Sequence, residues 1–220
     1  MTRGPGPGPL VVLAEGRDHA RIAIYPGVTE VVGAPAESQR LLERLAGLTP
    51  DAWAALSWAP AWQLGADPLS YRRQRTYVPA TAPLTDTDEA FTVRDWLKLA
   101  AALWGGTATG AIEAEQSRWG LQGVTRQRLG TLSPGWQQLV RLATSLVTQP
   151  RLWILDNPAQ HLDHEGRLIL EAVVAGRDAG WLPVATVVSV GVPLMLPNRW
   201  ALRWTGHRWQ AAEPSTPPGR

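Results

Sequence analysis

A strand that ends in glycine and leads into a helix is the layout of a phosphate-binding βα unit, and the sequence predicts one near its start. The predicted strand 30–32 ends at Gly33, and the apolar positions of residues 38–48 then recur with a helical rhythm. A triphosphate-binding loop has the form G-x-x-x-x-G-K-[ST], in which backbone N–H groups and the lysine bind phosphates and the hydroxyl holds Mg²⁺. After Gly33, the last three positions of that pattern are Ser38, Gln39 and Arg40. The chain's only lysine, Lys98, lies in a separate predicted helix, so the loop lacks its usual cation.

The elements around this unit predict an α/β fold with a mostly parallel sheet and a helical insertion. Ser133 and Pro134 are a good helix start, because serine caps a helix and proline is tolerated at its first position. The fully apolar run 152–155, which ends in Asp156, is typical of a buried parallel strand. The other predicted strands are 10–14, 21–25 and 184–189, together with a hairpin over 200–210 that turns at Thr205-Gly206. The other predicted helices are 92–103, 134–147 and 165–175. Residues 50–90 are predicted to be irregular.

Composition narrows the classes of function. The chain has no cysteine, which excludes disulfides and thiolate zinc sites, and its formal net charge of +2 gives no indication of nucleic-acid binding. No apolar run is long enough to cross a bilayer and the N-terminus lacks the apolar core of a signal peptide, so a cytoplasmic chain is expected. We expect one domain over residues 10–212, with flexible tails at 1–9 and 213–220.

Three segments, in order, resemble the ATP-binding cassette (ABC) ATPase family. The segment Leu132–Gln138 resembles the family's signature, usually Leu-Ser-Gly-Gly-Gln, and a helix, Pro150 and the strand Leu152–Asp156 follow it as in the Walker B region. Leu162-Asp163 resembles the family's D-loop, and residues 33–48 stand where the Walker A loop and helix belong. Ser133 and Asp156 are 23 residues apart, which suits the family's spacing.

The resemblance implies a P-loop NTPase-like fold with an antiparallel β lobe and a helical subdomain, about residues 80–145, that carries the signature. It also implies a degenerate ATP site. The family's glutamine of the Q-loop falls at Ala80, its general-base glutamate at Asn157 and its switch histidine near Val190, while Asp156 keeps the family's Mg²⁺-water ligand. With Gln39 in place of a lysine and Glu37 nearby, ATP binding should be weak, since two unit charges about 4 Å apart interact by roughly 4 kcal/mol at an effective dielectric near 20.

The partner-facing residues are better retained. In this family two subunits pair head to tail, and the signature helix start faces the other subunit's γ-phosphate. The residues that this implies for a partner's ATP are Ser133, Gly135, Gln137 and Asp163. Pro134 replaces a glycine and Trp136 a glutamine. The prediction is a heterodimer that holds ATP and Mg²⁺, if at all, at a shared interface, with none bound tightly by this chain alone.

The first hypothesis is therefore a degenerate ATP-binding subunit of a membrane transporter, peripheral to the inner face of the membrane through transmembrane partners that contact residues 76–94. Its length is similar to the haem-exporter-type cassettes of cytochrome c maturation. The alternative is a scaffold or regulator that binds no nucleotide, which Pro134 and Trp136 favour; an ATPase active alone is a third and weaker reading. Plain solvated loops are expected for the acidic run Asp86–Glu89 and for His161 and His164, so no metal site is predicted.

Overall fold

The computed structural model describes residues 9–15, 20–50, 56–58, 74–81, 83–103, 109–177, 185–189, 191, 194–196 and 199–212. The predicted tails fall outside these residues, apart from Pro9. Among the helices that the structure describes, none has the length and hydropathy needed to cross a membrane.

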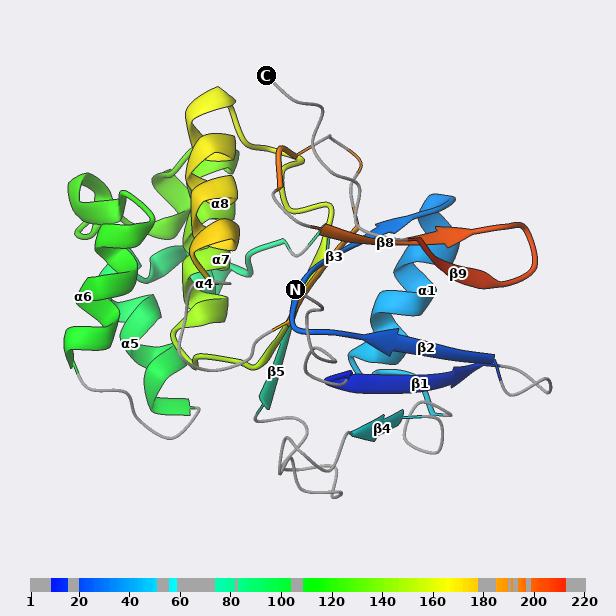
Figure 1. The fold of residues 1–220 in the computed structure, drawn as a ribbon. Coiled ribbons are helices and arrows are strands. Elements are labelled where there is room, and N and C mark those ends of the chain that lie inside the picture. The colour runs from blue at the N-terminus through cyan, green and yellow to red at the C-terminus, as the bar shows by residue number, and fades with distance from the viewer. Residues whose placement is uncertain are drawn as a thin grey trace, which may run out of the picture.

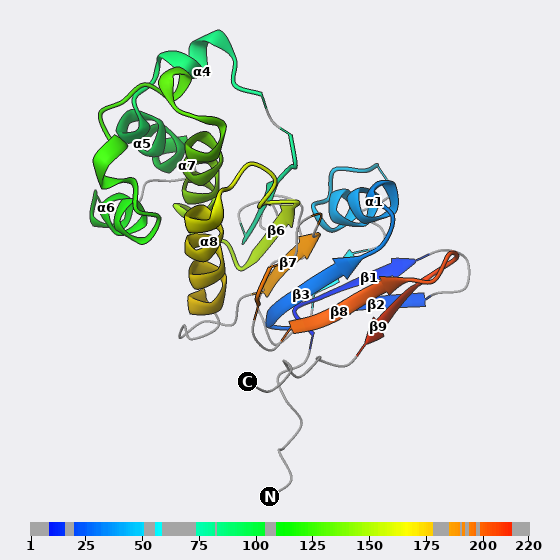
Figure 2. The same cartoon turned by 90° about the horizontal axis from the view of Figure 1, so that it is seen from above.

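The main sheet has six strands in the order β5-β6-β7-β3-β8-β9 (Figure 2). Every neighbouring pair is parallel except the hairpin β8–β9. The strands are β3 (Gly27–Val32), β5 (Arg75–Val78), β6 (Leu152–Asp156), β7 (Ala185–Ser189), β8 (Arg199–Trp204) and β9 (Trp209–Ala212). β6 and β7 lie inside this sheet, which explains why both are continuous apolar runs in the sequence.

A second sheet forms an antiparallel lobe. It has the order β2-β1-β4, with β1 (Val11–Glu15), β2 (Ala20–Ile24) and β4 (Leu56–Trp58). In Figure 1 this lobe and the helix α1 (Pro35–Leu45) lie on the side of the molecule opposite the helices α5 to α8. The predicted class, a mostly parallel sheet with an antiparallel β lobe and helices, is confirmed.

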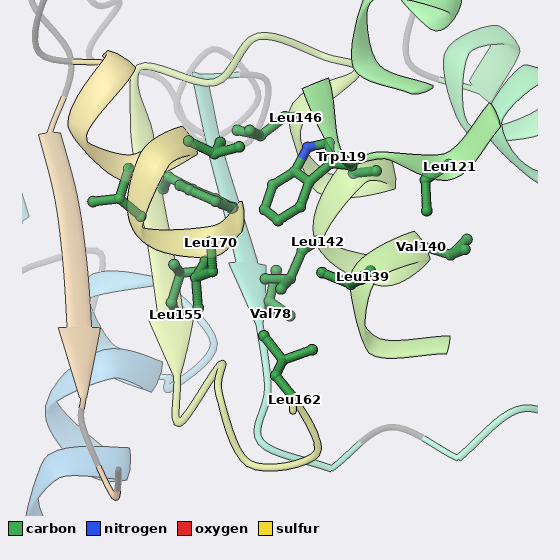
Figure 3. Packing of buried hydrophobic residues seen from close by; sticks show 14 of the residues in the cluster. Val78, Trp119, Leu121, Leu139, Val140, Leu142, Leu146, Leu155, Leu162 and Leu170 are labelled. Carbon is green, nitrogen blue, oxygen red and sulfur yellow. The ribbon is translucent and has the colours of Figure 1, made fainter. Parts of the chain in front are cut away.

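Two hydrophobic cores lie on the two faces of the main sheet, and alternate residues of β6 enter each. Leu152 and Ile154 pack with α1 and the antiparallel lobe, whereas Trp153 and Leu155 pack with the helices on the other face. These helices are α4 (Asp86–Ala90), α5 (Val93–Leu103), α6 (Thr109–Arg118), α7 (Pro134–Leu146) and α8 (His164–Arg177), with short 3-10 turns η2 (Leu121–Val124) and η3 (Leu129–Thr131) between α6 and α7. Figure 3 shows this core, where Trp119, Leu142, Leu146 and Leu170 meet β6.

The helix after Gly33 differs from its prediction at both ends. It was predicted over residues 38–48, but α1 begins three residues earlier, at Pro35, and ends at Leu45. Its C-terminal stop is the predicted one: Gly47 has a φ of 61°, and the Leu48 N–H donates to the Glu43 carbonyl at 2.9 Å.

The prediction of an irregular segment over 50–90 was wrong in part. The segment supplies β4 and β5, and the acidic run that was expected to be a loop forms the short helix α4. Thr85 and Asp88 close a capping box at its start. The predicted helix at 134–147 and the hairpin turning at Thr205-Gly206 are confirmed.

Candidate functional site

The start of α7 is an exposed helix tip formed by the sequence Ser133-Pro134-Gly135-Trp136. Ser133 is the N-cap, and its hydroxyl accepts a bond from the Trp136 N–H at 3.4 Å. The Gln137 N–H donates to the Ser133 carbonyl at 2.9 Å. Pro134 has no N–H, and the N–H of Trp136 bonds to the Ser133 hydroxyl. Gly135 is therefore the residue of this first turn whose N–H is left over from capping. The tip keeps the positive end of the helix dipole with fewer donors than a glycine-rich start would have.

This tip lies in a groove of about 550 Å³ that we call the signature groove, lined by residues 133–136, Leu139, 161–163 and Ile169 among others. The structure thus brings Ser133, Gly135 and Asp163 together, as the sequence predicted. A Cβ on Gly135 would lie 3.0 Å from the His161 carbonyl oxygen, so the close approach of the two segments requires glycine here. Asp163 is exposed, and its carboxylate accepts the Gly166 N–H at 2.8 Å, which caps the start of α8.

Gln137, the fourth residue predicted for a partner's nucleotide, has its amide nitrogen engaged within the chain. It donates to the carbonyls of Leu129 at 3.1 Å and Leu132 at 3.3 Å. These bonds hold the turn η3 against the start of α7. The Gln137 amide therefore positions the signature segment through bonds to the chain that precedes it.

The predicted phosphate loop is wound into the first turn of α1. The Ser38 N–H donates to the Ala34 carbonyl at 3.0 Å, which is a helical bond, and Pro35 at the first helical position has no N–H. Gly33 precedes this turn, and a Cβ on it would lie 3.0 Å from atoms of both Trp204 and Trp209. The backbone after β3 therefore follows a helix where a phosphate loop would leave its N–H groups open.

The side chains that replace the loop's lysine and hydroxyl bond to their own helix. The Gln39 amide donates to Glu43 at 2.8 Å, one turn further on. Arg40 lies 3.2 Å from Glu37, and 72% of its side chain is exposed. Each residue is therefore engaged on the outer surface of α1.

The carboxyl ends of β6 and β7 are joined by a polar network. The Ser189 hydroxyl donates to Asp156 at 2.5 Å and accepts the Asn157 N–H at 3.1 Å. Asn157 adopts the left-handed region with a φ of 44°, and its side-chain oxygen accepts the Gly191 N–H at 3.2 Å. A Cβ on Gly191 would lie 2.8 Å from the Asn157 amide, so these two residues fit closely. No sequence signal marked Ser189 or Gly191 as members of this network, because they meet Asp156 and Asn157 only through strand pairing.

The two remaining predicted positions are placed differently. Ala80 follows β5, beside the end of β6, and Val190 lies outside the described residues. Nearby, burial of the phenol raises the pKa of Tyr77 well above its ordinary value, and the carboxylates of Asp156 and Glu43 add to this effect. Within the described part of the chain, no group of three His, Asp or Glu side chains is arranged to hold a metal ion, and His161 and His164 are exposed.

A second groove, of about 630 Å³, runs along β5 between α1 and the helices, and we call it the β5 groove. It is lined by Leu48, Thr76, Pro79, Leu84, Trp96 and Arg141 among others. Most of these side chains are apolar, and Leu48 is 57% exposed. The lining includes residues 76–79, 83, 84 and 88 of the segment 76–94, where a membrane partner is predicted to bind.

Comparison with known proteins agrees with this arrangement. Residues 45–160 match the family model described as "ABC transporter". The chain is 30% identical over 149 residues to the cytochrome c biogenesis ATP-binding export protein CcmA of Albidiferax ferrireducens, an alignment that covers 66% of this chain and 69% of that protein. It is 34% identical over 126 residues to the zinc import ATP-binding protein ZnuC of Cereibacter sphaeroides, covering 57% of this chain and 45% of that protein.

A solved structure described as the ATP-binding subunit of an ABC transporter superposes with a TM-score of 0.73 at 18% identity, over 93% of this chain and 90% of that one. At that identity the likeness supports the fold alone. The match of the family model covers more than half of the chain; it includes the signature and the Walker B strand and ends two residues before Leu162-Asp163. The chain therefore belongs to the ABC transporter family of ATP-binding proteins.

Proposed function

We propose that this chain is an ATP-binding-cassette subunit that does not hydrolyse ATP at its own phosphate loop and supplies its signature helix to ATP held by a competent sister subunit. Members of this family work with transmembrane transporter subunits. The observation that carries the proposal is the contrast between the closed helical turn after Gly33 and the open groove at Ser133.

The first support is the backbone at Gly33. A phosphate loop binds through several converging N–H groups, yet here the Ser38 N–H is used within α1 and Pro35 has none. Glu37 adds a carboxylate in the same turn. A triphosphate placed there would meet fewer donors and a negative charge, so the residues present do not fit it.

The second support is the state of the magnesium and general-base positions. Asp156, the Mg²⁺-water ligand of the family, already accepts the Ser189 hydroxyl, and Asn157 holds Gly191 where the family has a glutamate. A neutral amide cannot take a proton from water at neutral pH. Position 157 therefore does not fit an activated water, whereas Asp156 retains a second carboxylate oxygen besides the one that accepts Ser189.

The third support is the signature groove. Its lining includes the Ser133 hydroxyl, the positive end of the α7 dipole and Asp163. A helix start of this kind is a ready-made anion site, and its groove opens to the surface rather than into the domain. We infer that the anion is a phosphate of ATP bound by the sister subunit.

The β5 groove supports the assignment of a transmembrane partner. Residues 76–79 and Leu84 line it, next to the exposed apolar side chain of Leu48. One relative is named for export and another for import. We therefore propose a transporter subunit and assign it no particular cargo.

The decisive experiment measures ATP hydrolysis by the chain copurified with the ABC ATPase subunit that accompanies it in its own cell. Ser133→Arg places a long cation in the signature groove and should abolish hydrolysis by the pair. Ser117→Arg, an exposed serine on α6 outside the groove, is the matched control and should leave hydrolysis unchanged. Equal activity of the Ser133→Arg and wild-type pairs would refute the proposal.

A second candidate, a scaffold that binds no nucleotide at either face, is favoured by one observation. Pro134 removes an N–H from the α7 tip and Ser133 engages that of Trp136, so the tip has fewer donors for a phosphate. The same experiment separates the two, because a scaffold would tolerate Ser133→Arg.

A further inference from the structure

One helix, α7, borders both grooves. Its first turn lines the signature groove, and Arg141, two turns later, lines the β5 groove. Between them, Gln138 is buried, with 1% of its surface exposed. A buried amide needs partners for both its oxygen and its nitrogen, and here they come from opposite directions.

Gln138 receives one bond and gives another. The Arg141 guanidinium donates to its side-chain oxygen at 2.8 Å. Its side-chain nitrogen donates to the Pro158 carbonyl at 3.0 Å, 20 residues further along the chain. The two bonds join the wall of the β5 groove to the segment that follows β6.

Pro158 is the second residue of the turn over residues 157–163, which we call the D-loop turn. Within it the Gln160 N–H donates to the Asn157 carbonyl at 3.2 Å and the Leu162 N–H to the Ala159 carbonyl at 3.1 Å. The turn ends at Asp163, in the wall of the signature groove. A bond to Pro158 therefore fixes the turn near its start, from a helix whose first turn also approaches it at His161.

The two side chains depend on each other. The Arg141 side chain is half-buried, which lowers the pKa of its guanidinium, and the Gln138 amide oxygen offsets part of the cost of removing this cation from water. If Arg141 moved away, the buried Gln138 oxygen would lose its donor. An unsatisfied buried acceptor is costly, so Gln138 would turn or shift and its bond to Pro158 would weaken.

We propose that Arg141 and Gln138 are a positioning pair that couples the β5 groove to the D-loop turn, so that a contact made on Arg141 alters the wall of the signature groove. The inference rests on the proposed function only for the nature of the partner in the β5 groove.

The test is hydrogen exchange of the isolated full chain, followed by mass spectrometry on peptides that cover 157–167 and, as an internal reference, β7. In Arg141→Ala, amides of the D-loop turn should exchange about five- to tenfold faster, as expected when one hydrogen bond is lost from a local opening equilibrium. Thr144→Ala is the matched control, since Thr144 lines the same groove one turn later and its hydroxyl donates to the Val140 carbonyl of its own helix. It should change exchange by less than about twofold.

Two further variants separate positioning from general loosening. Gln138→Glu keeps an acceptor for Arg141 but removes the donor to Pro158, and should accelerate exchange in the D-loop turn as much as Arg141→Ala. Arg141→Lys keeps a donor and should stay close to the wild type. Equal exchange in Arg141→Ala and Thr144→Ala, or acceleration that extends equally to β7, would overturn the proposal. Because no nucleotide or sister subunit is present, these results do not depend on the outcome of the Ser133→Arg experiment.

Discussion

Placing a glutamate at position 157, where the resemblance puts the family's general base, should cost stability and, on the proposed function, should not produce activity. Asn157 has a φ of 44°, a region that asparagine tolerates and that costs most other residues roughly 1–2 kcal/mol. Asn157→Glu also loses the bond from the Gly191 N–H, worth about 0.5–1 kcal/mol, and its longer side chain must fit where a Cβ on Gly191 would already lie 2.8 Å from the Asn157 amide. The sum is about 2 kcal/mol, or roughly 4–8 °C in melting temperature for a chain of this size.

The assay is thermal unfolding at pH 7 together with ATP turnover by the isolated chain. Asn157→Asp is the matched control, because aspartate places a carboxylate in the same region but tolerates the left-handed backbone and keeps an acceptor for Gly191. It should melt closer to the wild type than Asn157→Glu does. A glutamate variant as stable as the wild type would refute the backbone argument, and steady ATP turnover by it would refute the account of the site.

Two other predictions concern residues near the grooves. Because the pKa of Tyr77 is raised, the unfolded chain ionises this phenol above about pH 10 while the folded chain does not. The contribution of the Tyr77 phenol to stability is therefore complete below that pH and is lost as the pH rises. Tyr77→Phe should flatten the fall in unfolding free energy between about pH 10 and 11.5. A slope equal to that of the wild type would contradict this prediction. Gly135→Ala should lower the melting temperature by roughly 2–4 °C, since its Cβ would press on the His161 carbonyl, whereas Gly123→Ala, with no atom within 4 Å, should be neutral. Equal melting of these two variants would show that the signature segment and the D-loop can separate without cost.

Local signals predicted the element ends that depend on neighbouring residues. Ser133 and Pro134 predicted the start of α7, and Gly47 predicted the stop of α1. The start of α1 was predicted three residues late because the prediction followed the apolar rhythm from Ser38 onward and not Pro35, which is itself a helix-start signal. In the structure the helix begins at Pro35, as this local signal favours.

Other features were hidden because their cause is tertiary. β5 has only four residues, and three of them are half-buried, so it shows no continuous apolar run. The helix α6 buries Glu115 and Gln116 beside Ile112, and polar residues on its inner face obscure the apolar rhythm. The bonds of Gln138 and Asn157 join segments 20 and 34 residues apart and follow from the fold alone.

The most direct test of the closed phosphate loop is thermal unfolding of the isolated chain with and without 5 mM Mg-ATP, an excess of about 100-fold over a dissociation constant of roughly 50 μM. We expect no rise in melting temperature, because the Ser38 N–H is used within α1, Pro35 has none and Gln39 replaces the loop's lysine, so the turn after Gly33 has few groups to bind phosphate. Binding of that strength would add about 2.7 kcal/mol and raise the melting temperature by roughly 5–11 °C. A rise of that size would contradict the central claim that this chain cannot hold ATP by itself.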